Sequence, residues 1–214
     1  MSERLLRLTG MDDDVNGPGL TGARLRLFEA AVASFATKGF HGTTTRDIAA
    51  AAGMSPAALY VHHRSKEELL HLISTRGHAE ALSVCEQAVA MPGTPTEQLE
   101  RLVVDFARFH ALNPTVARIV NYELASLAPA HHAEVMAMRH AMDVVVREVV
   151  ARGVAEGFFD ATSPTMTAAA ILSLGIDIAR WYDPEGGWTP DDVAEHYRVL
   201  ALRMVGADQR PVAG

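Results

Sequence analysis

The sequence TTTRDIAAAAGMSPAALYVHHRSKEELL, from Thr43 to Leu70, predicts two short helices followed by the start of a longer one. Thr44 and Asp47 have the spacing of a capping box that opens a helix. Ser55 before Pro56 predicts a second start, because serine caps helices and proline fits their first position. This second helix is shorter than the roughly 12–15 residues that an isolated helix needs in water. Neighbouring helices must therefore hold it in place.

A helix that ends at a glycine, a short turn and a second short helix form the helix-turn-helix pattern. In that pattern the second helix lies in the DNA major groove, which is about 12 Å wide. Small side chains at positions 56–58 suit such an approach. We expect Ile48, Ala52 and Leu59 to form the small core that holds the two helices together.

The composition of the 214-residue chain favours an all-α protein, because aromatic residues are few and alanine, the best helix former, is frequent. Cys85 is the single cysteine, so no intrachain disulfide can form. The sequence shows neither a signal-peptide pattern nor 18 uninterrupted apolar residues. We therefore expect a cytoplasmic protein without a membrane span.

Charge is distributed unevenly along the chain, whose formal net charge is −7. From Gly22 to Lys66 there are six basic and two acidic residues, a net charge of +4. From Glu67 to Gly214 there are eleven basic and twenty acidic residues, a net charge of −9. A basic N-terminal part on an acidic body suggests that only the former faces an anion.

Helical periodicity and capping signals predict nine helices and no strand. The expected helices span residues 23–39, 44–53, 55–63, 66–89, 94–112, 113–127, 129–156, 163–182 and 189–206. We predict three parts: a flexible tail at 1–21, a DNA-binding domain at 22–67, and an effector-binding and dimerisation domain at 68–207.

The quoted stretch, together with the preceding LFEAAVASFATKGFHGTT, strongly resembles the DNA-binding motif of the tetracycline-repressor (TetR) family. The resemblance covers Ala23 to Leu72. The positions in step with the family are Phe35, Gly39, Thr44, Ile48, Ala49, Gly53, Leu59, Tyr60, Ser65, Lys66 and Glu68. It implies a nine-helix, all-α architecture with an N-terminal three-helix helix-turn-helix domain and a C-terminal helical ligand-binding and dimerisation domain.

The resemblance also implies which residues contact operator DNA. Those assigned to phosphates are Thr44, Tyr60, His62 and Lys66, and those assigned to bases are Ser55, Ala57 and Ala58. Arg46 would reach a phosphate or a groove edge. The stretch VHHR departs from the family pattern after Tyr60, and His63 there replaces an aromatic core residue.

The C-terminal stretch ARWYDPEGGWTPDDVAEHYRVLALRMVG resembles a branch of the family that senses acyl-CoA thioesters and controls fatty-acid or sterol breakdown. An effector pocket is predicted from apolar and ionisable residues, with ordinary core packing as the alternative for each. The candidates are Phe106, Phe109, His110, Tyr122, Arg139, Met142, Asp177 and Trp181. Arg139 and His110 would meet an anionic ligand, or pair with a carboxylate such as Asp105 or Glu123.

The last two expected helices carry apolar rows that would form a four-helix homodimer interface with a second copy, or pack only internally. The residues concerned are Ile171, Leu174, Ile178, Val193, Tyr197, Leu200 and Met204.

The ten histidines suggest a metal site, most of all His131, His132, Glu134 and His140. Adjacent residues of a helix point in different directions, so we expect no metal there. No phosphate loop, nucleophile elbow or zinc-protease pair is present, and we expect neither a cofactor nor an enzyme.

The resulting prediction is a repressor released from DNA by a small molecule. A drug-responsive repressor, or an activator, of the same family stays open. A protein of another class, an enzyme or a small-molecule carrier whose basic region is incidental, also stays open.

Overall fold

The computed structural model describes Leu20 and Gly22–Ala207, so the predicted tail at 1–21 lies outside the described residues except for Leu20. Within this part of the chain all regular structure is helical, as predicted. The nine α-helices are α2 (Gly22–Gly42), α3 (Thr45–Ala51), α4 (Pro56–His62), α5 (Lys66–Ala90), α6 (Pro95–Leu112), α7 (Pro114–Tyr122), α8 (Pro129–Ala155), α9 (Pro164–Trp181) and α10 (Pro190–Met204). A short 3-10 helix, η1, spans Leu124–Ser126.

Gly39 interrupts α2 where the sequence predicts the end of the first helix. Its φ of 69° and ψ of 169° are non-helical, and the chain then makes one further turn up to Gly42. An L side chain rarely adopts this φ, so the kink requires glycine. The last turn of α2, from Phe40 to Gly42, follows this kink and leads directly into α3.

Three predicted helix starts are capping boxes. Thr44, Thr94 and Thr189 each accept a hydrogen bond from the backbone N–H three residues later. In return, the acidic side chain at that later position accepts from the threonine N–H. These reciprocal bonds satisfy backbone donors that a helix terminus otherwise leaves free.

One predicted boundary was wrong: α7 ends at Tyr122 and not at Leu127. The chain leaves the helical conformation at Glu123, which has φ −101° and ψ 12°. The Glu123 carboxylate accepts a hydrogen bond from the Phe40 N–H at 3.1 Å. A contact between positions so far apart in sequence has no local signal, so the periodicity could not indicate this helix end.

Backbone contacts divide the chain into two compact units. The first contains the residues up to Glu80 together with Thr115–Met138, and the second contains Ala81–Pro114 and the residues from Arg139 onward. The beginning of α5, most of α7 and the start of α8 thus belong to the same unit as the helix-turn-helix. The functional boundary expected at residues 67–68 does not follow these contacts and stays a prediction.

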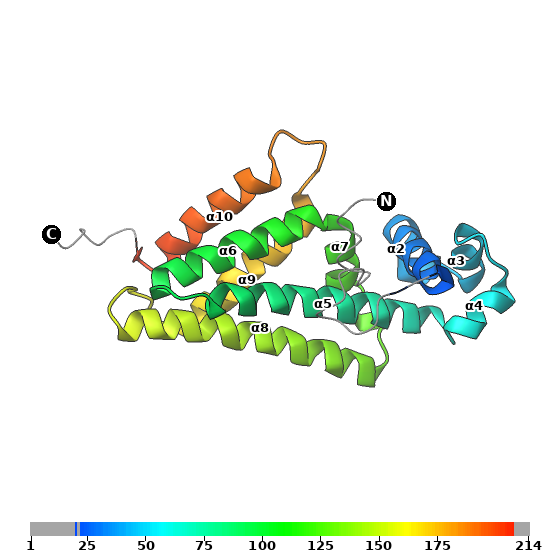
Figure 1. Ribbon diagram of the computed structural model, residues 1–214, viewed down its shortest axis with the longest axis horizontal. Helices are drawn as coiled ribbons and strands as arrows, with labels where there is room; N and C mark the ends of the chain where they lie inside the picture. The colour runs from blue at the N-terminus through cyan, green and yellow to red at the C-terminus, as the bar shows by residue number, and fades with distance from the viewer. Residues whose placement is uncertain (1–19, 21, 208–214) are drawn as a thin grey trace. The chain divides into compact units, whose positions relative to one another are not determined.

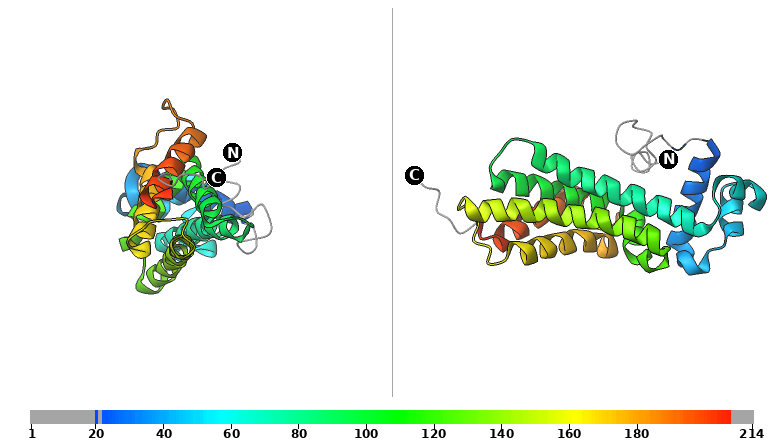
Figure 2. Two further views of the ribbon diagram at one scale, coloured as in Figure 1. Left: turned by 90° about the vertical axis from the view of Figure 1, so that its left-hand side faces the viewer. Right: turned by 90° about the horizontal axis from the view of Figure 1, so that it is seen from below.

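The first unit has one hydrophobic core, to which every one of its α-helices contributes. α2 packs against α3 and α4, and these three helices gather beside the start of α5 (Figure 1; Figure 2). The fully buried side chains of this core include Leu27, Phe28, Ile48, Leu59, Leu69, Leu70, Ile73 and Val135. The short helix α4 is therefore held by its neighbours, as its length requires.

In the second unit α6 packs against both α9 and α10 (Figure 1). Cys85 of α5 lies fully buried in this core, and burial raises the pKa of its thiol to about 12. None of the helices that the structure describes combines the length and the apolar character needed to cross a lipid bilayer.

Candidate DNA-binding surface and effector site

The helix-turn-helix consists of α3, the turn at 52–55 and α4, and its core is the predicted one. Ile48 and Leu59 are fully buried, and Ala52 is buried between the two helices. The Ser55 hydroxyl accepts a hydrogen bond from the Ala58 N–H at 3.2 Å and caps α4. Leu59 points into this core, so the opposite face of α4 is presented outward.

Ala57, Tyr60 and Val61 are exposed on the outward face of α4, and Pro56 is exposed at its start. Tyr60 is 54% exposed, and its hydroxyl lies 3.2 Å from the Thr45 hydroxyl of α3. This contact fixes the phenol against the preceding helix. Thr45 was not predicted as a site residue, because the spacing along the sequence does not show which α3 side chain reaches Tyr60.

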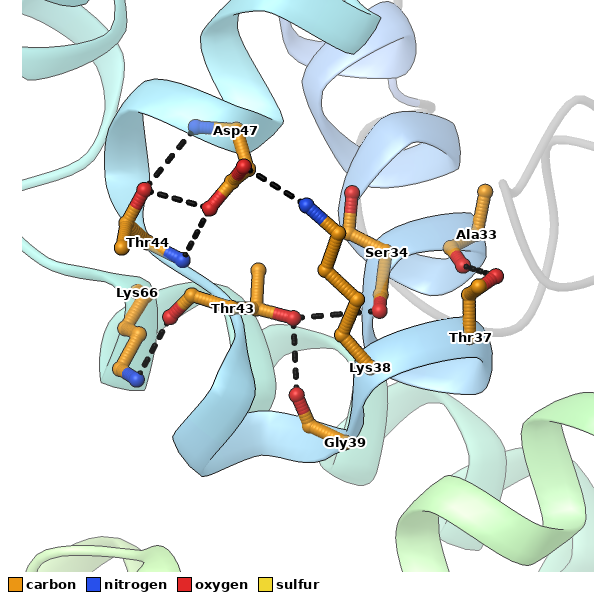
Figure 3. A network of polar contacts seen from close by, with 9 residues as sticks. All are labelled: Ala33, Ser34, Thr37, Lys38, Gly39, Thr43, Thr44, Asp47 and Lys66. Carbon is orange, nitrogen blue, oxygen red and sulfur yellow. Dashed lines mark hydrogen bonds and ion pairs between the residues drawn. The ribbon is translucent and has the colours of Figure 1, made fainter.

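Arg46 is exposed on α3, as a phosphate-binding residue must be. Thr44 lies two residues earlier, and its side chain caps the start of α3. Its backbone N–H and its hydroxyl both donate to the Asp47 carboxylate, at 2.8 and 2.6 Å (Figure 3). Lys38, 2.7 Å from Asp47, and then Thr44 hold the pKa of that carboxyl well below its usual range. A phosphate contact by Thr44 would have to exchange these bonds, and it stays a prediction.

Lys66 has an internal role that the sequence did not show. Its ammonium group donates to the backbone oxygens of Phe40 and Thr43, at 2.6 and 2.7 Å, and lies 4.3 Å from the centre of the Phe40 ring. The Thr43 hydroxyl in turn donates to the backbone oxygen of Gly39 at 2.8 Å (Figure 3). Lys66 therefore ties the start of α5 to the turn between α2 and α3. Its predicted phosphate contact is untested.

The two histidines of the VHHR stretch lie in different environments. His62 is half-buried at the end of α4, whereas His63 is buried and takes the core position expected of an aromatic residue. Its Nε2 atom has no hydrogen-bond partner among the residues described. Burial lowers the pKa of His63, with Arg24 and His62 acting in the same direction and Glu68 in the opposite one.

Polar contacts join the segment between α7 and α8 to the helix-turn-helix region. Besides the bond from Phe40 to Glu123, the Ser126 hydroxyl lies 3.2 Å from the His41 ring. The Glu67 carboxylate, one residue after Lys66, accepts from the Ala128 N–H at 2.8 Å. This segment is thus attached to both ends of the DNA-binding motif.

Two members of the histidine group considered for metal binding, His131 and Glu134, connect α8 to α5. His131 bonds to Glu67 at 2.8 Å, His71 bonds to Glu134 at 2.8 Å, and the two imidazole rings stack 3.7 Å apart. Burial would raise the pKa of Glu67, but the hydrogen bonds from Ala128 and His131 outweigh it and lower that pKa. No group of three metal-ligating side chains occurs within the described part of the chain.

The predicted effector residues lie in different environments, and their role stays a prediction. Phe106, His110 and Met142 are buried in the second unit, where His110 Nδ1 lies 2.9 Å from the Phe106 carbonyl oxygen. Phe109 is partly buried against the same core, and burial lowers the pKa of Arg139. Tyr122 lies in the other unit and is 57% exposed.

The acidic side chains named in the effector prediction each have a partner in the structure. Asp105 pairs with Arg108 at 3.1 Å, and the Glu123 carboxylate accepts from Phe40. Asp177 forms a two-point ion pair with Arg180 at 2.7 Å, and this guanidinium lowers the pKa of Asp177.

A cavity of about 650 Å³ opens between the end of α9 and α10. It is lined by Trp181, Trp188, Asp192, Val193, His196, Tyr197 and Leu200. The Trp181 ring stacks on Tyr197 and meets Trp188 edge-on, with both pairs of ring centres 6.4 Å apart. Trp181, predicted for the effector site, thus shares a cavity with residues predicted for the dimer interface. Trp188, which is 67% exposed, was missed.

Three predicted interface residues cannot form a surface. Ile171, Ile178 and Val193 are buried within a single chain. Ile178 is 0% exposed and packs with Ala107 and Ala111 of α6, because the apolar row of α9 faces α6. The remaining candidates reach solvent. Leu174 is 40% exposed, and Tyr197, Leu200 and Met204 are half-buried.

Family models match both the N-terminal and the C-terminal part of the chain. Residues 27–73 match the model of bacterial regulatory proteins of the tetR family, and residues 92–205 match the model of the tetracyclin repressor-like C-terminal domain. The HTH-type transcriptional repressor KstR2 of Mycobacterium tuberculosis is 31% identical over 189 residues, which cover 84% of this chain and 90% of that protein.

Solved structures give the same result. A tetR-family regulatory protein from Rhodococcus RHA1 is 38% identical, with a TM-score of 0.83 over 87% of this chain and 98% of that one. AibR, solved with isovaleryl coenzyme A and operator DNA, shares the fold at 23% identity and a TM-score of 0.75, over 84% of this chain and 96% of that one. The chain therefore belongs to the tetR family of bacterial regulatory proteins, which are DNA-binding regulators of transcription.

Proposed function

We propose that this protein is a repressor that a small-molecule effector releases from its operator. The observation that carries the proposal is the exposed face of α4, with Ala57, Tyr60 and Val61 presented outward and Arg46 exposed on α3. The net charge of +4 from Gly22 to Lys66 favours a polyanionic partner. KstR2, which covers most of the chain, is named a repressor. The protein would act in the cytoplasm by binding and not by catalysis.

An acyl-CoA thioester is the effector class that we propose. Two observations support it: the resemblance of the C-terminal stretch to the thioester-sensing branch, and the isovaleryl coenzyme A in the AibR complex. Effector and operator would weaken each other by the same factor, because the coupling between two sites on one protein is reciprocal.

A homodimer is the form that we propose for DNA binding. Apolar side chains of α9 and α10 that reach solvent would form its interface: the exposed Leu174, Met166 and Trp181 on α9 and the half-buried Leu200 on α10. Two copies would then present two α4 helices to half-sites about 34–36 Å apart, or somewhat more.

DNA binding is tested by fluorescence anisotropy with duplexes from the region upstream of the gene. Arg46→Ala should weaken binding about tenfold and reduce the slope of log affinity against log salt by about 1. Arg203→Ala, which removes an arginine that is also exposed from α10, is the control and should leave both quantities unchanged. Equal affinities of the wild type and Arg46→Ala would contradict the proposed DNA-binding surface.

The effector class is tested by titrating a panel of acyl-CoA thioesters into the protein–DNA complex. Release at micromolar concentration by one chain length, and not by free coenzyme A, is the expected result. If no thioester releases the DNA while drugs or other metabolites do, the thioester assignment fails and the repressor proposal stands.

A further inference from the structure

Val61 of α4 is the most exposed of the large apolar side chains that the structure describes, at 79%. It stands two residues after Leu59 and two before His63, both of which are buried. Successive residues of a helix are 100° apart, so a residue midway between two inward-facing ones points outward. Val61 therefore lies on the same face as Ala57 and Tyr60.

This face lacks the side chains that usually recognise bases by hydrogen bonding. From Pro56 to His62 the helix contains no Arg, Lys, Asn, Gln, Asp or Glu. The Ser55 hydroxyl oxygen already accepts from Ala58, and the Tyr60 hydroxyl is paired with Thr45. Bidentate recognition of guanine by Arg or Lys, or of adenine by Asn or Gln, is thus unavailable to α4.

The major-groove edge of a base pair has one apolar feature, the C5 methyl group of thymine. Alanine and valine side chains complement a methyl group, and burying them there removes apolar surface from water. Arg46 is exposed on the neighbouring helix α3, and the Tyr60 hydroxyl meets Thr45 of the same helix. Both suit contacts with phosphates, which fix the position of α4 but carry no sequence information.

Resting on the DNA binding proposed above, we propose that α4 selects its operator by contacts of Val61 and Ala57 with thymine methyl groups. Val61 is then a specificity-determining residue, and each half-site contains thymine at the positions that these two side chains reach. Removing one such methyl group should weaken binding about fourfold, the factor that corresponds to one buried methylene.

The test uses the full-length protein and a duplex selected with it from a random DNA pool. Each thymine is replaced in turn by deoxyuridine, which removes the methyl group and keeps every hydrogen-bonding group. We expect a loss of about fourfold at one or two positions in each half-site and no change elsewhere. Val61→Ala should abolish the difference between thymine and deoxyuridine at one of these positions and keep the salt dependence.

Val154→Ala, at an exposed valine of α8, is the matched control and should retain the full deoxyuridine effect. A duplex with deoxyuridine at every thymine that binds as tightly as the original would overturn the proposal while leaving DNA binding intact. So would a Val61→Ala variant that loses affinity equally for both duplexes, since Val61 would then contact the backbone. Failure to select any duplex would count against the proposed function itself.

Discussion

Apolar patterns in the sequence predicted packing residues both in the helix-turn-helix region and in the α9–α10 pair. In the structure the first set forms the expected core, whereas part of the second set packs elsewhere than expected. In the helix-turn-helix, Ile48, Ala52 and Leu59 form the expected core. In the α9–α10 pair, several residues expected on the surface, Ile178 among them, are buried against α6. The three predicted core residues of the first region lie within a dozen positions of one another, whereas the packing of Ile178 depends on a helix that is distant in the sequence.

A pattern of apolar residues therefore shows that a helix has a buried face, but not which helix covers that face. Capping residues and a short turn restrict the answer for α3 and α4. For α9 and α10 the sequence leaves two answers open, the rest of the same chain or a second copy. The structure shows internal packing for Ile178, and we propose contact with a second copy for the exposed Leu174.

The largest expected effect is on stability, and it distinguishes internal packing of α9 from contact with a second copy. Ile178→Asp places a carboxylate in the core of the second unit, and we expect a loss of more than about 4 kcal/mol in the free energy of unfolding. Leu174→Asp, at a residue four positions earlier that is 40% exposed, should leave the stability of the fold unchanged and shift sedimentation toward the monomer. If Leu174→Asp stays fully dimeric at low micromolar concentration, the proposed interface is wrong.

The next effect concerns Lys66. Lys66→Met removes both bonds to Phe40 and Thr43, and we expect a loss of about 3 kcal/mol because each is a charge-assisted bond at a partly buried site. Lys38→Met is the matched control: its ion pair with Asp47 is exposed and should contribute at most about 1 kcal/mol. Urea unfolding followed by circular dichroism measures both. Similar losses in the two variants would show that Lys66 has no special structural role.

A smaller effect is expected at the contact of α6 with α9. A methyl group added at Gly175 would lie 2.6 Å from the Phe106 ring, so Gly175→Ala should cost about 2 kcal/mol through overpacking. Phe106→Leu in the same chain should recover part of this loss, which a double-mutant cycle in urea would detect. Additive losses would mean that the methyl group at position 175 does not clash with the Phe106 ring.

The smallest effect concerns His63 and pH. Because burial lowers the pKa of His63, the unfolded chain takes up its proton first as pH falls below about 6.5. The free energy of unfolding should therefore decrease as pH falls below about 6.5, and the contribution of His63 should be fully present above that pH. His63→Phe should stabilise the fold by about 1 kcal/mol at pH 7, by removing the unpartnered Nε2, and should lessen the acid loss. Urea titrations at pH 5.5 and 7.5 measure both quantities. An unchanged acid loss in His63→Phe would assign it to other groups.

Most of the fold could be predicted because its signals are local. Threonine or serine caps and prolines mark most helix starts, and the motif from Thr43 to Leu70 indicates the DNA-binding face. The roles of Lys66, Glu67 and Glu123 could not be predicted, since their partners lie 23 to 83 positions away. The effector residues stay a prediction. Phe106 and Met142 have the composition of a pocket and of a core alike, and the structure buries both.

Cys85 gives the second unit a native chemical reporter. A thiol reacts as its thiolate, so a fully buried group with a pKa of about 12 is protected from alkylating reagents while the fold is closed. Labelling then measures how often this core opens, without any engineered probe. Because the chain has no other cysteine, the signal comes from one position alone. The same shielding makes this thiol a poor sensor of oxidants, since oxidation also begins from the thiolate.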